Sequence, residues 1–164
     1  CLVWACPAHY YTNFTYWTQH CWGVTCVNDM EAMLSYQPIT IGDKEQALAD
    51  LVRCYEKMMM RSHTNGGYVN LLDECWKMCE KFHTNIVIMY DHVSCKNVGG
   101  LHGLFEDQAR ERGIHLIWIP HDVMDPRTVS RREMREAFSQ YMVTVLNEKP
   151  LDPTLLDYED ALSW

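Results

Sequence analysis

The stretch Asn85-Ile86-Val87-Ile88-Met89-Tyr90 decides the fold class of this 164-residue chain. Five apolar side chains follow one another here with no polar residue between them. A strand of an antiparallel sheet usually alternates apolar and polar residues. A strand of a parallel sheet is buried on both faces and is apolar throughout. We therefore predict that residues 85–90 form a central strand of a parallel sheet.

Shorter apolar runs flank this strand along the chain and predict further strands at residues 2–5, 24–27 and 114–119. Between them the spacing of apolar residues predicts helices at residues 13–21, 43–61, 68–82 and 100–112, and from residue 130 onward. Asp43 and Ser130 each open a capping-box pattern. Strands that alternate with helices indicate βαβ units with right-handed crossovers. We expect an α/β fold, a three-layer Rossmann-like or flavodoxin-like parallel sheet of about four strands with helices on both faces.

Length and composition indicate one domain with its own core. We predict a single α/β domain at residues 1–150 and an acidic C-terminal tail at residues 151–164. The chain opens at Cys1 in a run that already has the pattern of a buried strand, so we expect a fragment of a longer subunit. A net charge of −8 argues against a nucleic-acid partner. The chain has no apolar run of roughly 20 residues and no export signal, so we expect a cytoplasmic protein without a membrane partner.

In open parallel sheets, ligands bind beyond the carboxyl ends of the strands. That rule selects three loops, at residues 6–12, 91–99 and 121–129. The sequence contains neither GxGxxG nor a P-loop pattern, so we predict neither a dinucleotide nor ATP in this domain.

Cys95 is the most suggestive of the eight cysteines, because it lies between the strongest strand and a helix. A helix N-terminus and the neighbouring Lys96 both favour the thiolate, the form that binds metals. Gly99 and Gly100 would let the backbone approach a bulky inorganic group. The alternative is a partly exposed loop cysteine that has no task.

A single cysteine cannot hold a [4Fe–4S] cluster, which takes three or four protein thiolates. Cys75 and Cys79 share a helix face, but they continue an apolar stripe, so we expect them in the core. Cys6 ends the first strand and is the best internal candidate to approach Cys95, although we do not expect it to do so.

The loop at 121–129 carries two acidic residues and an arginine, Asp122, Asp125 and Arg127, again at the carboxyl end of a strand. These side chains could bind a ligand, or they could form a capped turn before the helix that starts at Ser130. The sequence favours neither reading.

The order of these motifs resembles a known family. Its parts are Ser94-Cys95-Lys96 after a strand, two glycines and a helix, the segment from Asp122 to Arg127 after the next strand, and a helix with Ala137-Phe138. This order is similar to the C-terminal domain of the 2-hydroxyacyl-CoA dehydratase and benzoyl-CoA reductase family. The resemblance spans most of the chain and is densest between residues 85 and 145.

The resemblance implies an enzyme subunit in which Cys95, followed by Lys96, supplies one ligand to a [4Fe–4S] cluster. The other cluster cysteines would come from earlier parts of the subunit, so this fragment alone would bind no cluster and would be inactive. Asp122, Asp125 and Arg127 match the family's loop for substrate contact, although Pro120 stands where relatives often have an acidic residue.

The implied reaction is low-potential electron transfer to a CoA thioester, giving either dehydration, as in a lyase, or ring reduction. The implied partners are a second homologous subunit or a second copy, and an ATP-dependent activator protein. One alternative is a non-catalytic α/β module that mediates subunit contact. Another is a thiol or metal protein that uses Cys95 with Cys6 or Cys26.

Overall fold

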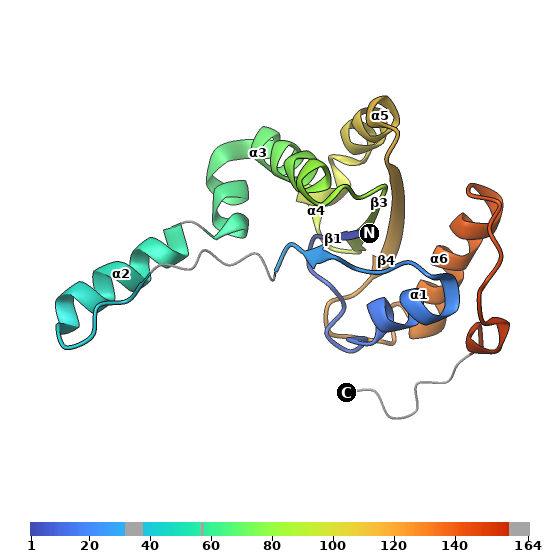
Figure 1. Ribbon diagram of the computed structural model, residues 1–164, viewed down its shortest axis with the longest axis horizontal. Helices are drawn as coiled ribbons and strands as arrows, with labels where there is room; N and C mark the ends of the chain where they lie inside the picture. Colours follow the sequence, from blue (N-terminus) through green and yellow to red (C-terminus); the bar gives the residue numbers. More distant parts are fainter. Residues whose placement is uncertain (32–37, 57, 158–164) are drawn as a thin grey trace.

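The computed structural model describes residues 1–31, 38–56 and 58–157, and its centre is a parallel sheet (Figure 1). The four strands are β1 (Leu2–Trp4), β2 (Asn28–Asp29), β3 (Ile86–His92) and β4 (His115–His121). Their order is β2-β1-β3-β4, and every neighbouring pair is parallel. The predicted α/β fold with a four-stranded parallel sheet is therefore confirmed.

Strand β3 organises the sheet because it pairs on both sides. It pairs with β1 from Val87 to Met89, and it pairs with β4 along its whole length, so that His92 lies opposite His121. Residues 86–90 are all buried, as expected for a strand covered on both faces. The chain leaves β1 toward β2 on one side and returns to β3 on the other. This places the topological switch point between β1 and β3, where open α/β sheets bind their ligands.

Helices cover both faces of the sheet (Figure 1). Helices α1 (Phe14–Trp22) and α6 (Arg131–Thr144) lie on one face, and α3 (Met59–Phe82) and α5 (His102–Arg112) lie on the other. Rings from both layers contact the sheet: Phe14 of α1 packs on Tyr90, and Phe105 of α5 packs on Trp118. The short helices α4 (Lys96–Gly99) and η1 (Pro153–Leu155) complete the domain.

The C-terminal segment folds back on α1. The backbone N–H of Leu151 donates to the carbonyl of Cys21 at 2.7 Å, and the Trp17 indole donates to the carbonyl of Leu155 at 2.8 Å. Trp17 also packs edge-on against Phe138 of α6. Residues 151–155 therefore close the outer side of the α1–α6 layer.

Two element boundaries differ from those predicted. The second strand is at Asn28–Asp29 rather than 24–27, because the first residues of the predicted strand belong to the C-terminal cap of α1. Gly23 caps α1 in the left-handed conformation, and the N–H of Val24 still bonds to α1 at Thr18. The helix predicted at 43–61 ends earlier, as α2 (Lys44–Glu56), and α3 begins at Met59. The predicted break is confirmed, since Gly67 is non-helical at φ 74° and ψ 178°.

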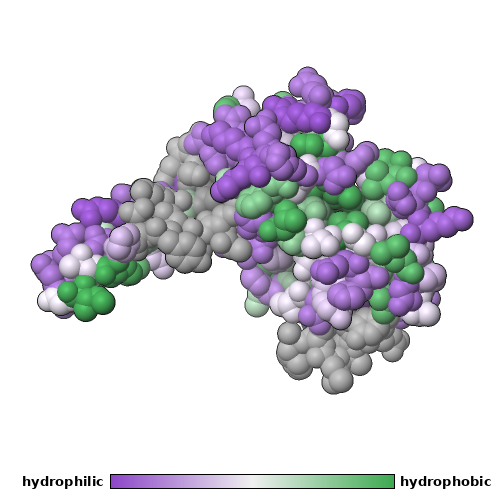
Figure 2. All heavy atoms as spheres, in the orientation of Figure 1, coloured by the Kyte–Doolittle hydropathy of each residue, from purple (hydrophilic) through white to green (hydrophobic). Residues whose placement is uncertain are grey.

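Helix α2 projects from the body as an arm (Figure 1). Its one buried residue is Asp50, whereas the large apolar side chains of the helix are exposed, with fractions of 49% for Leu48, 43% for Leu51 and 60% for Tyr55. Figure 2 shows hydrophobic surface on this arm. Within the described ranges, no helix has the length and apolar character needed to cross a membrane.

Candidate functional site

The three loops selected from the sequence meet at one edge of the sheet, which we call the carboxyl edge. They comprise residues 5–13 after β1, 93–95 after β3 and 122–130 after β4. The N–H of Val93 donates to the carbonyl of His121 at 3.0 Å, and the N–H of His9 donates to the carbonyl of Val123 at 2.9 Å. The hydroxyl of Tyr10 donates to the carbonyl of Val129 at 2.5 Å. Hydrogen bonds thus join the loop after β4 to the loop after β1, and the end of β4 to the loop after β3.

Cys95 lies at this edge as the N-cap residue of α4. Its N–H donates to the carbonyl of His92 at 2.8 Å, which turns the chain back toward the end of β3. Its carbonyl accepts from the N–H of Gly99 at 3.0 Å. The side chain is partly buried against the core, so the thiol is held in place and remains accessible from one side.

Lys96 begins α4, Gly99 ends it and Gly100 caps it. Lys96 is exposed as the first residue of α4. At Gly100 a Cβ would lie 3.0 Å from the carbonyl of Lys96, so the tight turn itself requires glycine there. At Gly99 a Cβ would meet no atom within 4 Å, so the space beside this residue is open.

Cys6 and Cys95 follow the neighbouring strands β1 and β3 at the same edge of the sheet. A charge on Cys95 makes the smallest contribution to the raised pKa of the Cys6 thiol. Ala5 reaches φ 64°, a left-handed conformation that costs a non-glycine residue energy, and this turn sets the position of Cys6. Burial and a hydrogen bond with Glu31 raise the pKa of the Cys6 thiol to about 12. Cys6 is therefore a protonated neighbour of Cys95.

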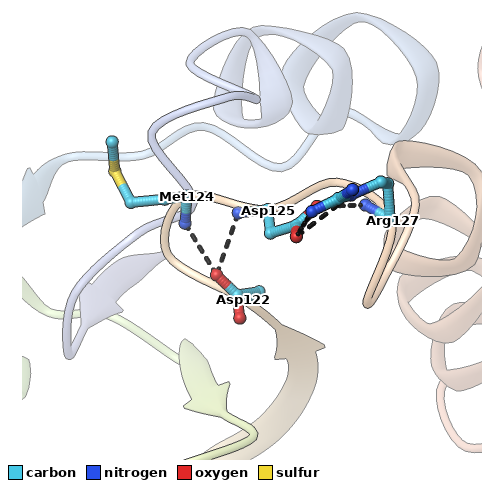
Figure 3. A network of polar contacts seen from close by, with 4 residues as sticks. All are labelled: Asp122, Met124, Asp125 and Arg127. Carbon is cyan, nitrogen blue, oxygen red and sulfur yellow. Dashed lines mark hydrogen bonds and ion pairs between the residues drawn. The ribbon is translucent and has the colours of Figure 1, made fainter.

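The loop after β4 forms a capped turn (Figure 3). Asp122 accepts from the N–H groups of Met124 and Asp125, both at 2.9 Å. Asp125 accepts from Arg127 through both carboxylate oxygens, with Nε at 2.9 Å from Oδ1 and Nη2 at 2.6 Å from Oδ2. The Arg127 side chain is 87% exposed. Of the two alternatives left open by the sequence, the structure contains the capped turn, and it also presents one guanidinium to solvent.

These hydrogen bonds keep both carboxylates ionised. Arg127 lowers the pKa of Asp125 to about 2, and the two backbone N–H groups lower the pKa of Asp122.

His121 is a residue that our sequence reasoning missed. It is 0% exposed, and neither of its ring nitrogens has an aligned hydrogen-bond partner among the described residues. Its ring packs against Tyr90 and His92, with centroids 5.1 and 5.5 Å away. Burial and the nearby His92 lower its pKa, so the imidazole is neutral. A neutral imidazole is therefore buried at this edge of the sheet.

An ion pair on the opposite face of the sheet was also missed. His102 Nε2 lies 3.3 Å from Oδ2 of Asp91, and the His102 ring stacks on Trp118 with centroids 3.7 Å apart. The Trp118 indole donates to Glu106 at 2.5 Å. Period-two alternation along β3 could have separated Asp91 from Tyr90 and His92, but nothing in the sequence pairs Asp91 with His102.

The remaining thiols lie away from this edge. Cys75 and Cys79 are buried in α3, which confirms the expected core position. A hydrogen bond from Cys75 lowers the pKa of Cys79 to about 7, and burial raises that of Cys75. Cys26 lies beside Cys1 at the other end of β1, so it does not pair with Cys95.

The side chains available as metal ligands decide which metal group this edge can bind. Within the residues that the structure describes, no group of three or more His, Cys, Asp or Glu side chains could hold a metal ion. The carboxyl edge nevertheless contains the Cys95 thiol, a second thiol at Cys6 and the buried imidazole of His121. These groups fit the wall of an iron–sulfur site that takes its remaining thiolates from elsewhere.

The chain was compared with protein families, curated proteins and solved structures. A family model described as "2-hydroxyglutaryl-CoA dehydratase, D-component" matches residues 1–142. No curated protein and no solved structure matches the chain. The matched range contains all four strands and the three loops of the carboxyl edge. The chain therefore belongs to the family of the 2-hydroxyglutaryl-CoA dehydratase D-component.

Proposed function

We propose that this chain is the carboxyl-terminal α/β domain of an iron–sulfur enzyme subunit that acts on CoA thioesters, and that Cys95 is a ligand of its [4Fe–4S] cluster. The observation that carries this proposal is the position of Cys95. It is a partly buried thiol at the switch point of the sheet. The chain belongs to a family of dehydratase components. Switch points are where such sheets bind ligands.

Each residue of the carboxyl edge has a task in this proposal. Cys95 holds one iron, and Lys96 places a positive charge beside the cluster without contacting the core. When bound, the cluster supplies an electron of low potential to the thioester substrate. Cys6 and His121 form the wall behind Cys95, where burial keeps water away. The chain itself would hold the cluster through Cys95 and shield it from water. The remaining thiolate ligands would come from outside the described residues.

The loop after β4 is proposed to contact the substrate through Arg127. Asp125 accepts from two of the five guanidinium N–H groups of Arg127 and fixes the orientation of the guanidinium. The outward N–H groups can bind a phosphate of a CoA ester. In this role Asp122 and Asp125 shape the loop rather than touch the ligand.

We further propose the partners that a component of a multi-component dehydratase needs. One is a second homologous subunit or a second copy, and another is an ATP-dependent activator that delivers the electron. The substrate is a CoA thioester, which is either dehydrated as a 2-hydroxyacyl ester or reduced in its ring.

The test is an iron, sulfide and visible-absorption assay on the whole native subunit, purified without oxygen. We compare it with its Cys95→Ala variant and with Cys54→Ala as a matched control, because Cys54 is a partly buried thiol on the distant helix α2. We expect about four irons per subunit, with loss of iron in Cys95→Ala and no loss in Cys54→Ala. Iron that is absent from the wild type, or unchanged in Cys95→Ala, would overturn the assignment.

A second candidate function is a non-catalytic module for subunit contact. The observation that favours it is the exposed apolar stripe of α2 formed by Leu48, Leu51, Val52 and Tyr55. A stable, colourless whole subunit that still assembles with its partner, and fails to do so as Leu51→Lys, would support this function.

A further inference from the structure

The loop after β4, residues 122–130, is fastened to the loop after β1 near both of its ends. Close to its start, the N–H of His9 donates to the carbonyl of Val123 at 2.9 Å. Close to its finish, the hydroxyl of Tyr10 donates to the carbonyl of Val129 at 2.5 Å. Two consecutive residues of one loop therefore hold the other loop at two points.

Tyr10 contributes to this attachment through its side chain and its backbone. Its carbonyl accepts from Arg131 at the start of α6, with Nε at 3.0 Å and Nη2 at 2.7 Å. The Sδ atom of Met134 lies 3.8 Å from its hydroxyl. Val129 is buried, and a buried carbonyl that loses its donor costs more free energy than an exposed one. The hydroxyl of Tyr10 is therefore a specific fastening point of the loop.

The same hydroxyl lies beside both ends of the loop. Burial raises the pKa of the Tyr10 hydroxyl, and the backbone of Asp122 opposes that shift. Asp122 begins the loop, and Val129 lies near its end. A hydroxyl that keeps its proton can donate to one group and accept from another, so a single side chain can restrain both ends.

The side chain that this attachment orients is Arg127, which lies between the two fastened points (Figure 3). Asp125 accepts from its Nε and Nη2, and the side chain is 87% exposed. The carboxylate fixes the guanidinium relative to the loop, and Tyr10 fixes the loop relative to the sheet. Together they keep an exposed guanidinium in one direction, which lowers the entropy that ligand binding costs.

We propose that Tyr10 is a positioning residue, which holds the loop after β4 so that Arg127 meets a phosphate of the CoA thioester. This inference rests on the proposed function, from which it takes the contact between Arg127 and the substrate. It adds that the affinity for coenzyme A depends on a residue that does not touch the ligand. Tyr10 acts through Arg127, so its substitution has little effect on that affinity once Arg127 is removed.

The experiment measures the dissociation constant of coenzyme A by isothermal titration calorimetry on the whole native subunit, purified without oxygen. A double-mutant cycle combines Tyr10→Phe, which removes only the hydroxyl, with Arg127→Gln. Tyr16→Phe is the matched control, because Tyr16 is an exposed tyrosine of α1. A tyrosine that only supports folding would not couple to Arg127 in its effect on binding, so the cycle separates positioning from stability.

We expect Arg127→Gln to weaken coenzyme A binding about tenfold or more, because a charge-assisted hydrogen bond to phosphate is lost. We expect Tyr10→Phe to weaken it about 3- to 10-fold, which is the effect of one hydrogen bond. In the Arg127→Gln background, adding Tyr10→Phe should change the dissociation constant less than about twofold. Tyr16→Phe should bind as the wild type does, and every variant should keep the iron content and visible absorption of the wild type.

Four results would overturn the inference. They are wild-type affinity in Tyr10→Phe, an equal loss from Tyr10→Phe in both backgrounds, wild-type affinity in Arg127→Gln, and loss of iron in Tyr10→Phe, which would make the residue a support of the cluster. A wild type that does not bind coenzyme A would overturn the proposed substrate together with the inference. The proposed cluster ligand fails separately, through iron that Cys95→Ala does not remove, so the failures are distinguishable in one set of preparations.

Discussion

Helices α6 and α2 share a sequence pattern, but the apolar side chains of α6 are buried and those of α2 are exposed. Both begin at a capping residue, and both repeat apolar residues at helical spacing. In α6 that stripe is buried, with Met134 and Phe138 at 0% exposure. In α2 the stripe is exposed, and the buried residue is Asp50. An apolar stripe therefore predicts a helix, but it does not predict what the stripe covers.

The difference follows from the position of each helix in the chain relative to the strands. Helix α6 directly follows β4, so its chain returns onto the sheet beside α1, where Phe138 meets Phe14. Helix α2 lies in the long excursion between β2 and β3, and both faces of the sheet are already covered by other helices (Figure 1). An isolated helix of this length is marginal in water, so we expect α2 to be less stable than α6.

The largest test of this contrast is truncation of the buried ring. We expect Phe138→Ala to lower the free energy of unfolding by about 3–5 kcal/mol, because it removes a fully buried ring that packs on three aromatic neighbours. Urea unfolding followed by circular dichroism measures the loss.

The matched variant on the arm is Leu51→Ala. Its side chain is 43% exposed, so we expect a change of less than about 0.5 kcal/mol in the same titration. A loss in Leu51→Ala as large as that in Phe138→Ala would contradict the view that α2 is unpacked in this chain.

A smaller test compares the two caps. Ser130 Oγ accepts from the N–H of Glu133 at 3.2 Å, and Glu133 accepts from the N–H of Ser130 at 2.7 Å. We expect Ser130→Ala to cost about 1 kcal/mol of global stability. Asp43 caps α2 through the N–H groups of Glu45 and Gln46, both at 3.1 Å. Asp43→Ala should leave global unfolding unchanged and accelerate amide exchange in α2 alone. Equal global losses would show that α2 folds cooperatively with the sheet.

The smallest effect is a pH dependence confined to the arm. Asp50 accepts from the N–H of Thr40 at 3.0 Å and from its hydroxyl at 2.7 Å, and these bonds lower the pKa of Asp50 to about 2 from 3.8. A depressed carboxyl pKa adds stability that is complete above pH 3.8 and disappears as the pH falls through about 2. We expect the Thr40 amide to lose its exchange protection in that window. Asp50→Asn should lack this pH dependence, and a Thr40 amide whose protection is independent of pH would contradict the assignment.

Much of the site could be predicted because it depends on the ends of strands. The apolar run at 85–90 predicted β3, the alternation of strands and helices predicted a parallel sheet, and such sheets expose their loops at one edge. Cys95 and Arg127 were selected on that basis, and the loops that carry them do meet at the carboxyl edge. Their roles toward cluster and substrate remain predictions.

The rest required contacts between distant segments. Cys6 and Cys95 share one edge of the sheet because β1 and β3 are neighbours, and nothing in the sequence of either segment predicts that order. His121 is buried because β4 pairs with β3 to its last residue. Asp91 meets His102 because the one-turn helix α4 folds α5 back over the strand end.

The sequence by itself therefore determined the class of fold, the caps and breaks of the helices, and the loops that carry the candidate site. These depend on local properties such as apolar period, capping side chains and glycine. Tertiary structure alone decided which thiols and imidazoles share the carboxyl edge and which apolar stripe remains exposed. Those outcomes depend on strand order and on which sheet face is still free, and neither is encoded within any one segment of the chain.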